Sequence, residues 1–173
     1  MSEEEKTNAS TLEMLKKNWY NHKGLRYYKK DSFDFKLESV GVFSNNELII
    51  KACDIIIESI ESLSDKAIAG ELLPVEKSIS TIKNAVDIKL ENIDYRIGKI
   101  IECVLHDNYY QGGVSKILSY VGFRKNHPHD AYSIIRLGFF DTEIEAATAE
   151  KAREIIHECC SHAKNVINNI KQD

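Results

Sequence analysis

The spacing of apolar residues along the chain predicts three helices that each carry one apolar face. In residues 46–69 apolar side chains recur every three or four positions, which is the spacing of a single helix face. The same spacing returns in residues 93–107 and, over about seven helical turns, in residues 144–171. Asn45 or Asn46 is a candidate cap for the first helix. The stripes include Ile55 and Ile56 in the first helix, Ile101 in the second, and Ile155, Ile156, Cys159, Ala163 and Val166 in the third.

Alternation of apolar and charged residues predicts several short strands. Phe33, Phe35 and Leu37 alternate with charged side chains, which is typical of a strand with one buried face. Residues 86–90, 117–124 and 132–140 are predicted as further strands, the last two joined by a turn at Pro128. Together these elements predict an α+β fold in which a small mixed sheet packs against long amphipathic helices.

Changes in composition and the positions of glycine and proline predict the domain organisation of the chain. Residues 1–10 are polar and are expected to be a disordered tail. Residues 11–70 then contain a basic, aromatic stretch, the first strand and the first helix. Gly70 and Pro74 indicate a linker over residues 71–84, which separates that segment from a second domain at residues 85–173.

Composition is that of an ordinary soluble domain. The chain has 173 residues, of which 43% are hydrophobic and 29% charged. Its net charge of -4 gives no general attraction to nucleic acid or to an anionic membrane. The four cysteines fall in predicted helices and are expected to be reduced thiols of an intracellular protein. The acidic start is unlike a signal peptide, and no apolar run approaches the roughly 18 residues of a membrane span, so we expect no membrane contact.

Two groups of residues are candidates for chemistry, and neither predicts an active site. They are His157, Cys159, Cys160 and His162 in the last helix, and His106, His127 and His129 with Asp94, Asp107 and Asp130. In the first group His157 pairs with Cys160, and Cys159 with His162. The two pairs lie at opposite borders of the apolar face of the helix, so the four side chains cannot converge on one metal ion. The second group shows proximity in sequence without a nucleophile or phosphate-binding motif. We therefore expect no catalytic residue, metal or cofactor.

A series of short motifs between residues 94 and 137 has the order and spacing of a known family. The motif residues are Asp94 and Gly98, then Gly122, Phe123 and Arg124, then His127 and Pro128, then Arg136 between Ile135 and Leu137. This order resembles the small assembly subunit of cellular RNA polymerases, the archaeal L subunit and its eukaryotic counterparts, which are related to the bacterial alpha amino-terminal domain. Tyr95, Arg96 and Lys99 replace the family's usual His, Thr and Asn. The resemblance implies the alpha/L-like dimerisation fold for residues 85–173.

A second resemblance lies upstream, in the stretch from Phe33 to Gly41 and the helix that follows. It is similar to the last part of the archaeal D subunit, which pairs with L in polymerases, so residues 11–70 are interpreted as a D-like carboxy-terminal segment. The two features in one chain resemble the carboxy-terminal part of the fused D/L-type subunits of large DNA viruses. The first half of a D-like unit is not found in this sequence.

The resemblance implies a non-catalytic assembly subunit of a DNA-directed RNA polymerase. Such a subunit joins a D-like partner chain and supports the two largest subunits, so that it meets DNA and RNA only through the complex. It would act in the host cytoplasm or virion if viral, and otherwise in the nucleus or cytoplasm. A D/L pair shares a four-helix bundle, and three helices are predicted here, so we expect an apolar groove for the partner. The stripe residues and the motif residues are therefore predicted to be interface or structural positions.

Two alternatives remain open at this point. Residues 16–30 combine Trp19, Tyr20, Tyr27 and Tyr28 with six lysines and arginines. This composition fits a small module that binds single-stranded nucleic acid. It also fits an arm whose rings pack on a neighbouring subunit while its lysines stay in water, and the arm is favoured because a few basic residues in an acidic chain attract nucleic acid only modestly. The other alternative is a free-standing homodimer that uses the same helical stripes.

Overall fold

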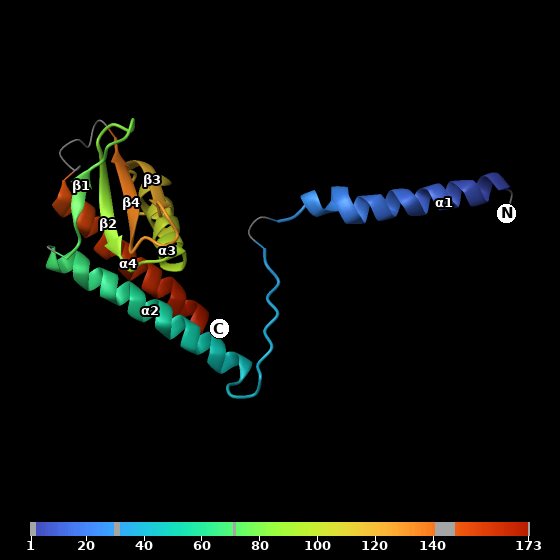
Figure 1. Ribbon diagram of the computed structural model, residues 1–173, viewed down its shortest axis with the longest axis horizontal. Coiled ribbons are helices and arrows are strands. Elements are labelled where there is room, and N and C mark those ends of the chain that lie inside the picture. Colours follow the sequence, from blue (N-terminus) through green and yellow to red (C-terminus); the bar gives the residue numbers. More distant parts are fainter. Residues whose placement is uncertain (1–2, 30–31, 71, 141–147, 173) are drawn as a thin grey trace. The chain divides into compact units, whose positions relative to one another are not determined.

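The structure is a computed structural model that describes residues 3–29, 32–70, 72–140 and 148–172 (Figure 1). For residues 3–7 it describes the backbone alone. The chain divides into two compact units, Met1–Glu38 and Ser39–Asp173. Each unit is described by itself.

The first unit is mainly one helix followed by two tighter turns. Helix α1 spans Glu3–Asn18 and continues into the π-helical turn η1 (Trp19–Lys23) and the 3-10 turn η2 (Gly24–Arg26). The prediction of a disordered tail over residues 1–10 is therefore wrong from Glu3 onward, while residues 1 and 2 lie outside the described residues. The sequence of α1 begins with three glutamates and ends with two lysines, and this order of charges complements the helix dipole.

The strand predicted over residues 33–37 is also wrong. Residues 32–40 have no regular secondary structure, and the side chains of Phe33, Phe35 and Leu37 are exposed. A strand needs a neighbour that pairs with its backbone N–H and C=O groups. The described residues of the first unit contain no other strand. Apolar alternation alone therefore did not produce a strand here.

The second unit contains one four-stranded sheet. Its strands are β1 (Val75–Lys77), β2 (Ala85–Glu91), β3 (Leu118–Arg124) and β4 (Tyr132–Phe139), in the order β1-β2-β4-β3. Every pair is antiparallel, so the prediction of a mixed sheet is wrong. Strands β2, β3 and β4 confirm the predicted strands. Strand β1 lies within the predicted linker, and its three residues are too few to show an alternating pattern.

The three predicted helices are confirmed in the second unit. They are α2 (Asn45–Ala69), α3 (Tyr95–Leu105) and α4 (Ala149–Gln172). The residue that caps α2 is Ser44, not Asn45 or Asn46, and it forms a capping box with Glu47. Residues 144–147 of the predicted last helix lie outside the described residues.

Helix α3 runs on into a π-helical turn, η3 (His106–Tyr110), where the sequence predicted a loop from Tyr109 onward. The ring of Tyr109 is buried, and its hydroxyl donates a hydrogen bond of 2.5 Å to Glu158 of α4. This buried bond explains why the chain stays helical past the predicted end of α3, because it fixes η3 against α4.

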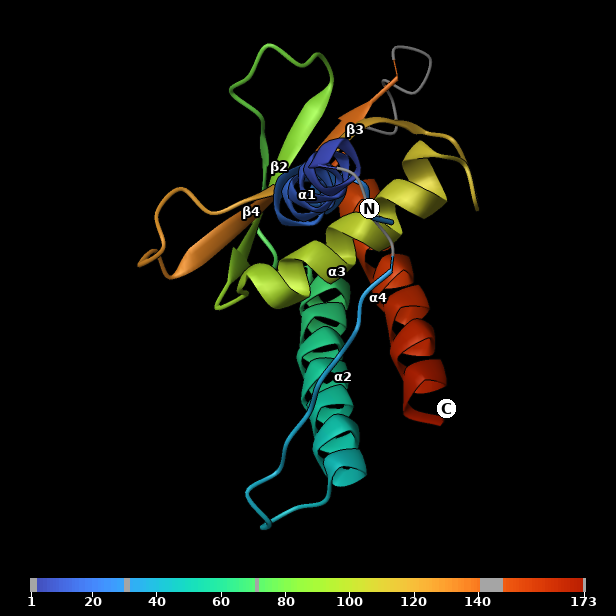
Figure 2. The same cartoon turned by 90° about the vertical axis from the view of Figure 1, so that its right-hand side faces the viewer.

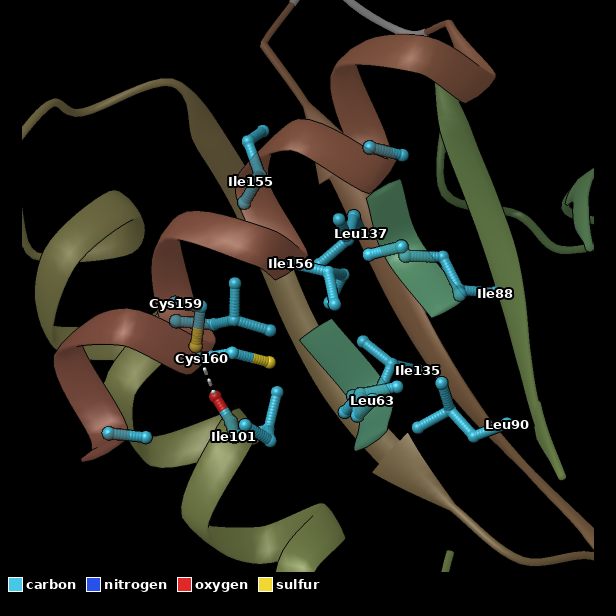
Figure 3. Close-up of a cluster of buried hydrophobic side chains, with 14 of the residues drawn as sticks. Leu63, Ile88, Leu90, Ile101, Ile135, Leu137, Ile155, Ile156, Cys159 and Cys160 are labelled. Atoms are coloured by element: carbon cyan, nitrogen blue, oxygen red, sulfur yellow. Dashed lines mark hydrogen bonds between the residues drawn. The ribbon is translucent and has the colours of Figure 1, made fainter. Parts of the chain in front are cut away.

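Helix α4 is at the centre of the core and packs against the sheet, α2 and α3 (Figures 1 and 2). The thiol of Cys159 lies 3.5 Å from the backbone oxygen of Ile101 in α3 and donates to it (Figure 3). The apolar residues labelled around this contact are Leu63, Ile88, Leu90, Ile101, Ile135, Leu137, Ile155, Ile156, Cys159 and Cys160, all of them buried. The fold is therefore α+β, with one closed core between the sheet and the helices.

Candidate protein-interaction surface

The first motif residues form a contact between the start of α3 and strand β3. The carboxylate of Asp94 caps α3 by accepting hydrogen bonds from the backbone nitrogens of Arg96 and Ile97, at 3.0 and 3.3 Å. The Arg96 guanidinium also bonds this carboxylate and lowers the pKa of Asp94. One turn later, a Cβ atom at Gly98 would overlap the ring of Phe123. The glycine thus lets the ring lie directly on the helix.

A residue that the motifs did not indicate completes this contact. Glu102 of α3 accepts a hydrogen bond of 3.0 Å from the backbone nitrogen of Phe123 and also pairs with Lys99. Strand β3 is at an edge of the sheet, so this N–H has no strand beside it. Glu102 therefore fixes the edge of the sheet to α3. The spacing of a glutamate one turn after Gly98 was the available clue.

Arg136 is engaged within the sheet. Its Nε and Nη2 donate to the two carboxylate oxygens of Asp87, at 2.6 and 2.7 Å, and the two residues are direct cross-strand partners. Both side chains are largely buried, and the hydrogen bond to Arg136 lowers the pKa of Asp87. Arg136 is thus a structural residue of this sheet, and its partner Asp87 was not predicted from the sequence.

The remaining motif residues lie in or near the β3–β4 turn. Gly122 is buried in β3 beneath the side chain of Tyr120. His127 and Pro128 are exposed in the turn itself. The backbone nitrogen of His127 donates to the carboxylate of Asp130, and the backbone nitrogen of His129 donates to the ring Nδ1 of His127. The imidazole therefore satisfies backbone groups of a turn. The motif residues do not gather in one site.

Most of the predicted interface stripe is buried in the chain's own core. Ile101, Ile155, Ile156, Cys159 and Ala163 are fully buried, so the prediction that they meet a separate partner chain is wrong for this closed core. The reason is that α2 covers one side of α4 and the sheet covers the other. These residues do line the contact between the predicted D-like helix and the L-like domain.

The cysteines and histidines of α4 do not form a reactive site. Burial raises the pKa of the Cys160 thiol to about 12, and it also raises the pKa of Cys159. His157 is occupied by a hydrogen bond of 2.8 Å between its Nδ1 and the hydroxyl of Ser64 in α2. Within the described residues, no group of three or more His, Cys, Asp or Glu side chains could hold a metal ion.

At one end of the α2–α4 pair, apolar side chains are exposed to solvent. Burial ends at Cys53 in α2 and at Ile167 in α4, and ion pairs of Asp54 with Lys171 and Glu61 with Lys164 show that the two helices run antiparallel. The amino end of α2 and the carboxyl end of α4 therefore lie together, beyond the sheet and α3 (Figure 2). We call the exposed apolar residues towards this end the overhang: Ile49, Ile50, Val166 and Ile170, each between 40% and 52% exposed. Ile56 borders it and is half-buried.

The loop before α2 adds to the same end of the helix. Val40, Val42 and Phe43 are exposed, and the ammonium group of Lys51 lies 4.7 Å from the centre of the Phe43 ring. Exposed apolar surface of this extent commonly marks a protein contact.

Comparisons with known proteins add no relative. No protein-family model matches the chain, and no curated protein matches its sequence. Among the helices of the described residues, none combines the length and the apolar character needed to cross a membrane.

Proposed function

We propose that this chain is a non-catalytic assembly subunit of a DNA-directed RNA polymerase, with the alpha/L-like dimerisation fold. The observation that carries the proposal is the element order β2-α3-β3-β4-α4 with the motif residues at structural positions within it. Asp94 caps a helix, Gly98 admits the Phe123 ring, and the His127-Pro128 pair forms a turn. The resemblance implies structural or interface positions for these residues, and the contacts they make support that interpretation.

The proposed partner is a D-like chain that covers the overhang. In the resembled heterodimer four helices pack together, and here α2, α3 and α4 leave apolar side chains exposed at one end of the α2–α4 pair. One helix of a partner, the fourth of such a bundle, would cover them. The exposed stretch around Phe33 and Phe35 is a second candidate contact, because a partner could offer the neighbouring strand that the first unit lacks.

Burial of the overhang would supply part of the free energy of a specific complex. Full burial of an isoleucine or valine side chain contributes about 1.5 to 3 kcal/mol, and the four overhang side chains are already about half covered. Covering them would contribute on the order of 5 kcal/mol before the costs of association. This gain supports a lasting complex when it adds to polar contacts, and it is too small for the overhang alone to explain tight binding.

The proposal assigns no chemistry to this chain. In the resembled enzymes the catalytic metal and its carboxylates belong to the largest subunit, and the D/L-like pair is a platform on which the two largest subunits assemble. The site of action would follow the polymerase, in the host cytoplasm or virion for a viral enzyme and in the nucleus or cytoplasm otherwise.

Affinity purification of the tagged chain from its native source tests the proposal. We expect the two largest polymerase subunits and a D-like chain to co-elute and to be identified by mass spectrometry. The variant Ile49→Lys/Ile170→Lys places charges in the overhang and should lose these chains. Val114→Lys, which changes an exposed valine outside the helices, is the matched control and should keep them. Recovery of the chain without any polymerase subunit would overturn the proposal.

A further inference from the structure

The first unit carries a concentration of positive charge on an acidic protein. We call residues 16–29 the basic arm; it contains Lys16, Lys17, Lys23, Arg26 and Lys29. None of the chain's 27 acidic residues falls within it, although the whole chain has a net charge of -4. The basic arm therefore has a local electrostatic character opposite to that of the protein as a whole.

These five cations have no carboxylate partner in the part of the chain that the structure describes. None of them lies within ion-pair distance of an Asp or Glu side chain there, and all are exposed. Lysines of the second unit behave differently, since Lys89, Lys151 and Lys164 each pair with a glutamate. The charge of the basic arm is thus available to a partner.

The turns η1 and η2 also arrange aromatic rings on this surface. The rings of Trp19 and Tyr27 stack with their centres 5.4 Å apart and their planes 18° from parallel. Gly24 lies close to this pair, since a Cβ atom there would be 3.0 Å from the Trp19 oxygen and 3.1 Å from its indole nitrogen. With Tyr20 and Tyr28, the four rings are between 46% and 76% exposed.

From this combination we infer that the basic arm binds single-stranded nucleic acid. Unpaired lysines and arginines would contact the phosphates, and exposed flat rings would stack on unpaired bases. A DNA duplex would offer the phosphates but not the base faces. An anionic membrane would also attract the cations, but it offers no flat base on which the stacked Trp19 and Tyr27 rings could continue their stack. This inference does not depend on the polymerase proposal and adds a direct nucleic-acid contact to it.

Binding of a fluorescently labelled single-stranded oligothymidylate to the full chain, measured by anisotropy over a salt series, tests the inference. Neutralisation of phosphates by five cations predicts a slope of log affinity against log salt of about -3.5. The variant K16Q/K17Q/K23Q/R26Q/K29Q should flatten this slope and bind about a hundredfold or more weakly at low salt. The matched control K77Q/K83Q/K116Q/R124Q/K125Q removes the same charge from the second unit, at four exposed positions and the half-buried Lys125, and should stay within about twofold of the parent.

The rings are tested separately from the charges. Trp19→Ala should weaken binding by about tenfold at a fixed salt concentration and leave the salt slope unchanged, whereas Trp19→Phe should retain most of the affinity. Loss of folding is not a concern, because residues 8–29 contain no buried side chain. Parent-like binding by the five-site arm variant would overturn the inference. So would an equal loss in the control, equal affinity for a duplex, or tighter binding to phosphatidylserine vesicles.

Discussion

The two ends of the α2–α4 pair carry similar residues and differ in what covers them. Near the sheet, Ile60 and Leu63 of α2 and Ile156 of α4 are almost completely buried. At the other end, Ile49 and Ile170 are about half exposed. Both ends belong to the same apolar stripes, so the spacing of isoleucines does not distinguish them. The difference is that the sheet and α3 reach only one end (Figure 2).

This comparison shows what an amphipathic pattern can and cannot reveal. The pattern indicates which face of a helix avoids water, but not whether the covering surface comes from the same chain or from another. Here the same chain covers the carboxyl half of α2, and an external protein is proposed to cover its amino half. Substitutions at the two ends should therefore have unlike effects.

The largest expected difference is between two isoleucines of α2. Ile60 is 1% exposed and Ile55 is 60% exposed. Ile60→Ala should lower the free energy of unfolding by about 2 to 5 kcal/mol, because it leaves a cavity in the core. Ile55→Ala should change it by less than about 0.5 kcal/mol. Urea denaturation followed by circular dichroism measures both, and equal losses would contradict the burial of Ile60 and the exposure of Ile55.

Gly98 tests how tightly the closed region is packed. An added methyl group would overlap the Phe123 ring, so Gly98→Ala should destabilise the chain by about 1 to 3 kcal/mol even though alanine favours helices. The double variant Gly98→Ala/Phe123→Ala should lose less than the sum of the two single losses, because the overlap is absent. Thermal or urea unfolding of the four proteins gives this coupling. Simple additivity would show that the contact does not constrain α3.

The smallest expected effect concerns two ion pairs, one at each end. Hydrogen bonding to Arg136 lowers the pKa of Asp87 below its usual 3.8. The Asp87 contribution to stability is therefore complete above that pH and is lost as the pH falls towards the lower pKa of the folded state. Asp87→Asn should cost about 1 to 2 kcal/mol at neutral pH, and this difference should shrink below about pH 4.

Asp54 provides the control for that experiment. Its carboxylate lies 2.5 Å from the Lys171 ammonium group, but both side chains are substantially exposed at the open end. Asp54→Asn should change the free energy of unfolding by less than about 0.5 kcal/mol at neutral pH. If both substitutions lower the free energy of unfolding equally, the Asp87–Arg136 pair stabilises the sheet no more than an exposed ion pair would.

The sequence predicted the elements of the second unit well because their patterns are long and regular. Helices α2, α3 and α4 and strands β2, β3 and β4 all follow from apolar spacing. Strand β1 is too short to show a pattern, and η3 depends on the Tyr109–Glu158 bond, which joins positions far apart in sequence. The strand predicted at residues 33–37 failed for a related reason, since pairing requires a neighbour that local sequence does not reveal.

The candidate site was predicted in outline and misplaced in detail. Ile55 and Val166 of the predicted stripes are exposed, and their contact with a partner stays a prediction. Ile155, Ile156 and Cys159 lie in the core, because α2 and the sheet cover α4 from two sides. The spacing of apolar residues does not reveal which elements cover a helix. Glu102 and Asp87 were missed because their hydrogen-bond partners are distant in sequence. Glu102 binds the backbone nitrogen of Phe123, and Asp87 binds the guanidinium of Arg136.

Sedimentation equilibrium of the purified full chain over a range of concentrations tests the central claim most directly. If the overhang is an uncovered protein-binding surface, the parent should form larger species as concentration rises, and Ile49→Lys/Ile170→Lys should remain monomeric with unchanged stability. A discrete dimer that needs no other polypeptide would favour a homodimeric adaptor over the polymerase subunit. A parent chain that stays a monodisperse, stable monomer at every concentration would contradict the account.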